Sequence, residues 1–212
     1  MTLLGCIGAT ARRVLSLALG DGDPNRRGCS YAVTVITPIS PGRTGELREL
    51  VRSYGPGPAS PLAKVPDVQF ARWVIIDQLR TDWAGAPKPP PRLKSDYLLF
   101  SADVTAPAYR AGSLPDSFFR DLATHTPADV DKVWGHCRRY PGSGDVERFA
   151  AYMKQSQITI GLYYAAFPDA TVDDINHALH VRAQLGELAL TNQHVKSARD
   201  LRRAYVKRAA SW

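Results

Sequence analysis

The hydrophobic and polar positions of this chain follow two periods, and the two periods alternate along the sequence. Four segments have the extended, apolar-rich pattern of strands: 31–36, 69–76, 97–104 and 158–166. Between the first and second of these segments, residues 44–54 have apolar positions at helical spacing. The same spacing occurs at about 115–137, between the third and fourth. The order strand–helix–strand therefore occurs twice.

Two successive strand–helix–strand units predict an α+β domain of the ferredoxin-like type, with an antiparallel sheet and helices on one face only. A shorter helix is expected at 144–154, and a last helix from the N-cap Thr171 to about residue 189 or beyond. This domain would span 31–191, between an N-terminal extension (1–30, with a possible helix at 9–19) and a basic C-terminal tail (192–212). A proline-rich surface loop at 84–92 would join its halves.

Alternation along each strand predicts which side chains face the helices. Two rows are expected against the helices: Leu98, Phe100, Ala102 and Val104, and Ile158, Ile160, Leu162 and Tyr164. The opposite rows place Tyr97, Leu99, Ser101 and Asp103 on the open face, together with Tyr163. Alternation alone does not decide which row of 69–76 faces the helices. We expect Arg72 on the open face, beside Asp103 or a bound anion, because an unpaired arginine under a helix layer is strongly destabilising. The alternative is a structural arginine in a salt bridge or at a strand edge.

The positive charge is unevenly distributed. The composition, 44% hydrophobic and 22% charged, is ordinary for a globular protein, and the net charge is +7. Six basic residues against one aspartate lie in 196–208 alone. No nucleic-acid-binding motif accompanies them, so a nucleic-acid partner is not expected. The tail is expected as a solvated helix, or as a docking surface for an acidic partner or a membrane surface.

Cysteine usage and hydropathy indicate a cytoplasmic protein. Cys6, Cys29 and Cys137 are odd in number and lack metal-binding spacing, which favours reduced thiols. The apolar start of the chain lacks the preceding basic residues of a signal peptide. No segment approaches 18 uncharged apolar residues, so no membrane span is expected.

The segment 133–142 combines the most reactive residue types. Gly135 is unfavourable inside a helix, which indicates a helix end or a close backbone approach. His136 could be a haem or metal ligand or a general base, or a helix C-terminal histidine. Cys137 could be a nucleophile or thiolate ligand whose pKa the adjacent arginines lower, or a buried apolar side chain. His177 and His180 have metal-capable spacing but fall on the polar face of their helix, which favours solvation.

Several phrases give the chain a family resemblance: the turn at 39–42 before the first helix, the segment 168–172 before the last, and the repeated strand order. Through these features the segment 31–178 resembles the dimeric α/β-barrel superfamily, in which two ferredoxin-like sheets pair open face to open face. The short segments 70–73, 134–137 and 140–142 resemble those of a bacterial subfamily. This subfamily implies no particular activity for the chain. The resemblance implies a homodimer, and relatives that include cofactor-free monooxygenases, small cyclases and haem enzymes similar to chlorite dismutase and dye-decolourising peroxidases. The GxxDG motif of the peroxidases is absent.

These observations predict a small-molecule enzyme, an oxidoreductase of bacterial secondary metabolism, haem-dependent or cofactor-free, with a partly apolar substrate. Arg72 would orient an anionic or carbonyl group, His136 would be haem ligand or base, and Tyr163 with Asp103 would handle protons. The alternatives are a non-catalytic binding or accessory protein and a cofactor-free cyclase.

Overall fold

The computed structural model describes residues 23–55, 57–78, 84–85, 93–105, 114–195 and 197–209. The possible helix at 9–19, Cys6 and most of the proline-rich loop lie outside these residues. The chain divides into two compact units, Met1–Asp169 and Ala170–Trp212. We call them the sheet unit and the helical unit and describe each by itself.

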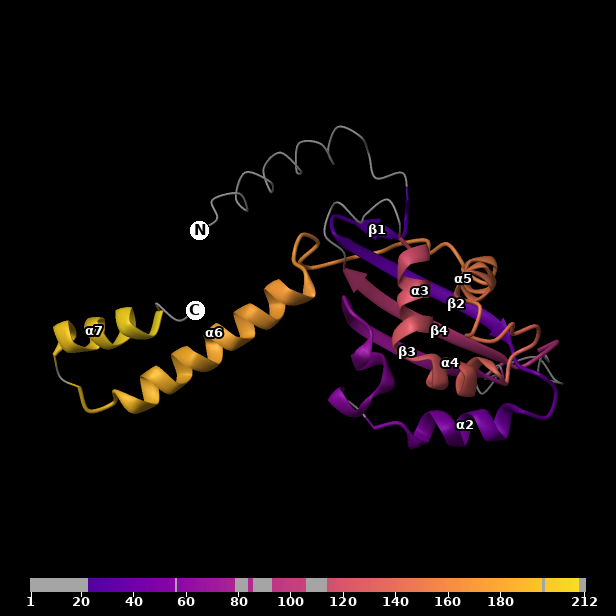
Figure 1. Ribbon diagram of the computed structural model, residues 1–212, viewed down its shortest axis with the longest axis horizontal. Coiled ribbons are helices and arrows are strands. Elements are labelled where there is room, and N and C mark those ends of the chain that lie inside the picture. The colour runs from indigo at the N-terminus through magenta and orange to yellow at the C-terminus, as the bar shows by residue number, and fades with distance from the viewer. Residues whose placement is uncertain are drawn as a thin grey trace. The chain divides into compact units, whose positions relative to one another are not determined.

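The sheet unit contains one open antiparallel sheet of four strands (Figure 1). Its strands are β1 (Arg26–Arg27), β2 (Ser30–Pro38), β3 (Val68–Ile76) and β4 (Tyr97–Thr105), in the order β1-β2-β4-β3. The long strands β2, β3 and β4 confirm the first three predicted strands. β4 pairs with both of the others, so the predicted α+β class and antiparallel sheet are confirmed.

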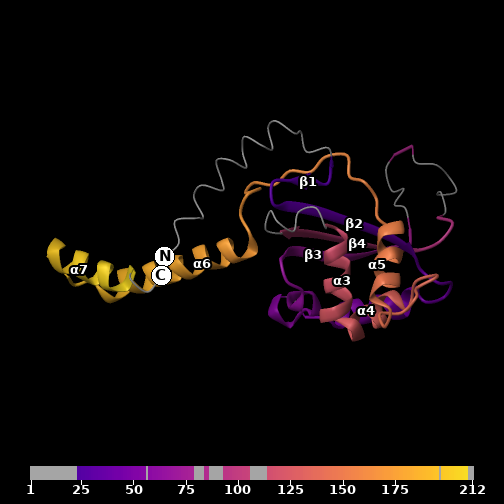
Figure 2. The same cartoon turned by 45° about the horizontal axis from the view of Figure 1, so that its top comes forward.

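In the described part of the sheet unit, four helices pack around one hydrophobic core. They are α2 (Thr44–Ser53), α3 (Asp116–His125), α4 (Pro127–Trp134) and α5 (Val146–Gln155); two short 3-10 turns, Gly57–Ala59 and Pro61–Lys64, follow α2. Aromatic rings join the helices to the sheet: the ring of Phe100 in β4 stacks on that of Phe118 with their centres 6.2 Å apart, and it meets Trp134 edge-on at 5.4 Å. Figure 2 shows α3 and α5 in front of the strands.

The two faces of the sheet differ as the alternation predicts. The four β4 residues expected against the helices are fully buried: Leu98, Phe100, Ala102 and Val104. The opposite face of the sheet contains one row of β3 side chains. In this row Phe70 is 49% and Val74 38% exposed, and Arg72 between them is exposed as expected. The described residues of the sheet unit therefore leave this open face without a helix layer.

The prediction of a strand at 158–166 was wrong. Gln157 makes a single bridge to Val35, and the chain then leaves the sheet, with Leu162 83% and Tyr164 82% exposed instead of packed under helices. The short strand β1 pairs with the neighbouring part of β2, and the Asn25 side chain accepts the N–H of Ile160 at 2.9 Å. A local hairpin closes a far shorter loop than a pairing with residues more than a hundred positions away, which favours β1 at this edge.

The single helix predicted at 115–137 is two helices. Thr126 has non-helical dihedrals (φ −134°, ψ 45°), and Pro127 begins α4, where its missing N–H is harmless. The second helix ends at Trp134, and a Cβ on Gly135 would clash with the carbonyl oxygen of Asp131. Both meanings suggested for Gly135, a helix end and a close backbone approach, are therefore confirmed.

The helical unit consists of α6 (Val172–Thr191) and α7 (Ala198–Ala209). The predicted N-cap Thr171 is confirmed: its hydroxyl accepts the N–H of Asp174, whose carboxylate accepts the N–H of Thr171 in return. No residue of either helix is buried. Among the described residues, no helix combines the length and apolar character needed to cross a membrane.

The proposed division at 30/31 and 191/192 stays a prediction, although two facts bear on it. Arg26 and Arg27, in the expected extension, pair with Tyr31 and Ser30 in the sheet. The residues of α6, expected within the ferredoxin-like domain, group with α7.

Candidate functional site

Three of the four predicted site residues, Arg72, Asp103 and Tyr163, lie together on the open face. Phe70 of β3 is opposite Asp103 of β4, and the Arg72 guanidinium lies 5.8 Å from the centre of the Phe70 ring. Tyr163 comes from the extended segment after α5 and interacts with both Asp103 and Ser30. We call Arg72, Asp103 and Tyr163 the open-face cluster.

The charges of the open-face cluster influence one another. Burial raises the pKa of the Asp103 carboxyl above its ordinary value, and the positive charge of Arg72 opposes part of that shift. Burial also raises the pKa of Tyr163, the negative charge of Asp103 adds to the shift, and a hydrogen bond with Ser30 opposes it. The cluster thus combines a carboxyl that holds its proton more tightly than usual with a phenol that stays protonated.

His136, the fourth predicted residue, lies elsewhere. Its Nδ1 is 2.7 Å from the carbonyl oxygen of Lys132, so this nitrogen carries the ring proton and donates it. Its Nε2 is 3.5 Å from a carboxylate oxygen of Glu46, and only 12% of the side chain is exposed. These contacts fit the helix C-terminal alternative, and they leave Nε2 as the one nitrogen that a ligand could approach.

Two places along β2 show how far His136 lies from the open-face cluster. Asp103 pairs with Ala32 near one end of β2, whereas the carbonyl oxygen of Pro38 at the other end accepts the N–H of Arg138. At about 3.3 Å per residue, these six steps correspond to roughly 20 Å. The cluster and His136 therefore do not form one catalytic site within a single chain.

Cys137 is a buried thiol, 4% exposed. Burial raises its pKa to about 11, and the Thr37 hydroxyl, which donates to its Sγ at 3.2 Å, opposes the shift. Arg138 and Arg139 therefore do not produce the lowered pKa that a nucleophile or thiolate ligand would need, and the buried apolar alternative fits better.

Sequence reasoning missed a polar network centred on Asp131. Its carboxylate accepts hydrogen bonds from the Tyr140 hydroxyl at 2.5 Å and from the N–H and hydroxyl of Ser143, both at 2.9 Å. Burial raises the pKa of Asp131, but these hydrogen bonds outweigh it and the net shift is downward. The network ties the turn after α4 to the helix, and no sequence motif connects residues at these spacings.

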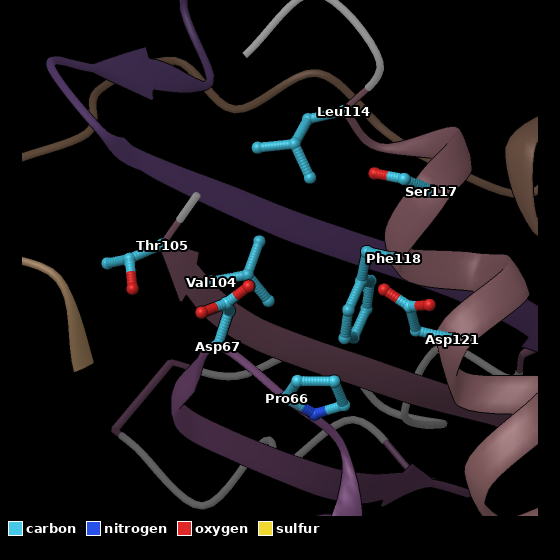
Figure 3. Close-up of a pocket in the computed structure, with 8 residues that line it drawn as sticks. All are labelled: Pro66, Asp67, Val104, Thr105, Leu114, Ser117, Phe118 and Asp121. Carbon is cyan, nitrogen blue, oxygen red and sulfur yellow. The ribbon is translucent and has the colours of Figure 1, made fainter. Parts of the chain in front are cut away.

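A small cavity lies between α3 and the end of β4 (Figure 3). Asp67 and Asp121 are among its lining residues, beside the apolar side chains of Val104, Leu114 and Phe118. Its volume of about 10 Å³ accommodates at most one water molecule. A substrate does not fit there.

Metal-binding geometry is lacking in the described part of the chain, where no three His, Cys, Asp or Glu side chains converge. His177 and His180 on α6 are both exposed, as the solvated alternative predicts. The chain was also compared with family models, with curated proteins and with solved structures, and none of the three comparisons found a match.

Proposed function

We propose that the protein is a small-molecule enzyme whose substrate binds over the open face of the sheet, with the open-face cluster as its chemical centre. The single observation that carries this proposal is Asp103, a half-buried carboxyl with a raised pKa beside a cation and a phenol. Perturbed carboxyls with a specific charged neighbour are common in catalytic sites. Phe70 and Val74 would supply the apolar wall for a partly apolar substrate.

We further propose a ferredoxin-like domain that dimerises open face to open face. The βαβ unit formed by β2, α2 and β3, with β4 inserted between the two strands, supports this arrangement. Residues 156–158, which exchange backbone hydrogen bonds with Thr34 and Ile36, would take the place of the last strand. A second copy would cover the exposed Phe70 and Val74 and close the pocket.

The cluster suits an oxidoreductase that works without a cofactor. Asp103 would accept a proton from a phenolic or enolic substrate, Arg72 would stabilise the resulting anion, and Tyr163 would donate a hydrogen bond. A cyclase would use the same three roles. A haem-dependent reaction would require His136 Nε2 to exchange Glu46 for iron, away from the cluster.

Oxygen uptake with a panel of phenolic and enolic compounds tests the activity, comparing the wild type with Asp103→Asn. We expect uptake in the wild type and a loss of about a hundredfold or more in the variant, as for a general base. Asp77→Asn, which changes a carboxylate paired with Arg48 at 2.6 Å, is the matched control and should retain activity. Equal rates in wild type and Asp103→Asn would contradict the proposal.

Two further measurements separate the alternatives. A Soret band in freshly purified protein that disappears in His136→Ala would favour the haem-dependent reaction over the cofactor-free one. The anionic dye 1-anilinonaphthalene-8-sulfonate combines an apolar body with a negative group, and Arg72→Gln should weaken its binding. Dye binding that depends on Arg72, without turnover of any compound, would favour the non-catalytic binding protein.

A further inference from the structure

A groove on the helix side of the sheet unit is independent of the open-face cluster. It lies between α5, the turn after α4 and the end of β2, and its volume is about 800 Å³, within the usual range for small-molecule sites. One stripe of α5 forms a wall, because Arg148, Tyr152 and Gln155 follow one another at helical spacing. Arg138, Arg139 and Tyr140 form the facing wall. We call it the arginine groove.

The charge of the arginine groove is uncompensated. Three guanidinium groups line it, from Arg138, Arg139 and Arg148, and no carboxylate does. The same unit pairs other arginines closely: Arg43 with Glu46 at 2.9 Å, Arg48 with Asp77 at 2.6 Å and Arg120 with Glu147 at 2.6 Å. Among the described residues, none of the three groove arginines has a carboxylate partner of this kind. Like charges around one groove repel one another, so a bound anion would stabilise the groove.

Hydrogen bonds on both sides fix the backbone at Arg138. The N–H of Arg138 donates to the Pro38 carbonyl at 2.8 Å, and its carbonyl oxygen accepts the Tyr152 hydroxyl at 3.3 Å. The Tyr140 ring meets the Tyr152 ring at 6.0 Å, and its hydroxyl is fixed on Asp131. The groove surface formed by the Arg138 backbone and the two tyrosines is therefore preorganised, which lowers the entropic cost of binding.

The backbone of Arg139 has an unusual conformation. Its φ is +60°, a left-handed conformation that is unfavourable for a residue with a Cβ. Glycine would adopt this turn without strain, yet the position has an arginine that lines the groove. Strained backbone that positions a charged side chain is typical of ligand-binding sites.

We propose that the arginine groove binds a soluble phosphate-bearing small molecule, of about nucleotide size. Guanidinium groups bind phosphate oxygens in bidentate geometry, and a phosphate group approaches two negative charges at neutral pH. The Tyr140 and Tyr152 rings provide aromatic surface for an organic part of the ligand. A nucleic acid is not favoured, because three arginines in one groove do not form the extended basic stripe that a polynucleotide follows.

Isothermal titration calorimetry of the full chain with ADP and with pyrophosphate tests this proposal. We expect both probes to bind, with an affinity that decreases as salt is raised. Arg138→Gln combined with Arg148→Gln should weaken binding by about tenfold or more, since charge-assisted hydrogen bonds are lost. Arg52→Gln removes the same charge at an exposed position of α2 outside the groove and should bind as the wild type does.

Arg139→Gly separates binding from folding. Because glycine relieves the left-handed backbone, this variant should melt at the same temperature as the wild type or higher, while its affinity for ADP falls about tenfold. The proposal is overturned if neither probe binds at millimolar concentration, if Arg52→Gln weakens binding as much as the groove variants, or if duplex DNA binds more tightly than ADP.

Discussion

The sheet unit and the helical unit differ in how helix capping goes together with the burial of side chains. Among the described residues, every buried aromatic or aliphatic side chain belongs to the sheet unit, although its helices α2 and α3 lack a side-chain N-cap. The helix α6 has a capping box and twenty residues, yet nothing on α6 or α7 is buried. Capping forms a helix, but burial against other elements provides most of the stability of a domain. We therefore expect substitutions in the two units to differ in size and in what they disturb.

The largest difference should come from Trp134→Ala in the core. Trp134 is fully buried against the rings of Phe100 and Phe149, so its truncation leaves a large cavity. Substitutions of this kind lower the free energy of unfolding by about 3–5 kcal/mol. Urea denaturation followed by fluorescence of the remaining tryptophans measures it. Leu179→Ala, at a 54% exposed position of α6, should stay within about 0.5 kcal/mol, and equal losses at the two sites would contradict the comparison.

A smaller and local effect is expected for Thr171→Ala. The variant removes the hydroxyl that accepts the Asp174 N–H and should destabilise α6 by about 1 kcal/mol. Hydrogen exchange should show faster exchange in α6 and unchanged protection in β2 and β4. Thr171→Ser keeps the hydroxyl and serves as the control; loss of protection in the sheet strands would mean that the two units unfold together.

A pH-dependent effect is expected at Asp103. Its folded pKa is raised, so the folded state binds the proton more tightly than the unfolded state, and stability decreases as pH rises from the unfolded pKa of about 3.9 through the folded pKa. Asp103→Asn removes the buried charge and should stabilise the protein at pH above the folded pKa. The gain should shrink towards acid pH. Urea melts across this range measure it, with Asp77→Asn as the control that should not stabilise at any pH.

The smallest effect is expected from truncation after His194, which removes α7 and its basic residues. Because no residue of α7 is buried, the urea midpoint of the sheet unit should not change. If the tail docks an acidic partner, truncation should weaken that association, and the association of the intact chain should decrease with salt. A chain that no longer folds after truncation would show that α7 belongs to the core.

The fold could be predicted where local pattern and burial agree. Alternation placed Phe100 under the helices and Asp103 on the open face because β4 is buried on one side only. It misplaced Leu162 and Tyr164, because β1 pairs with the part of the β2 edge that their strand would have occupied. Thr126 and Pro127 could have indicated the break between α3 and α4, since a proline is favoured at the first position of a helix.

The site could be predicted only in part. Arg72 was placed correctly on the open face from the cost of burying its charge, and Asp103 from alternation. Tyr163 also interacts with Asp103, although the strand from which alternation placed it does not form. His136 has suitable chemistry but lies elsewhere, because its position depends on a one-turn contact to Lys132 and on a non-local contact to Glu46. The arginine groove could not be predicted, because its two walls come from separate elements whose packing no single segment encodes.

Sedimentation velocity on two matched variants tests most directly the central claim, that the open face of the sheet unit is completed by a second copy. Phe70→Glu and Leu185→Glu each place a charge at a partly exposed apolar position, 49% exposed on the open face and 41% exposed on α6. We predict that the wild type and Leu185→Glu sediment as dimers and Phe70→Glu as a monomer. A monomeric wild type, or a Phe70→Glu dimer beside a Leu185→Glu monomer, would contradict the account.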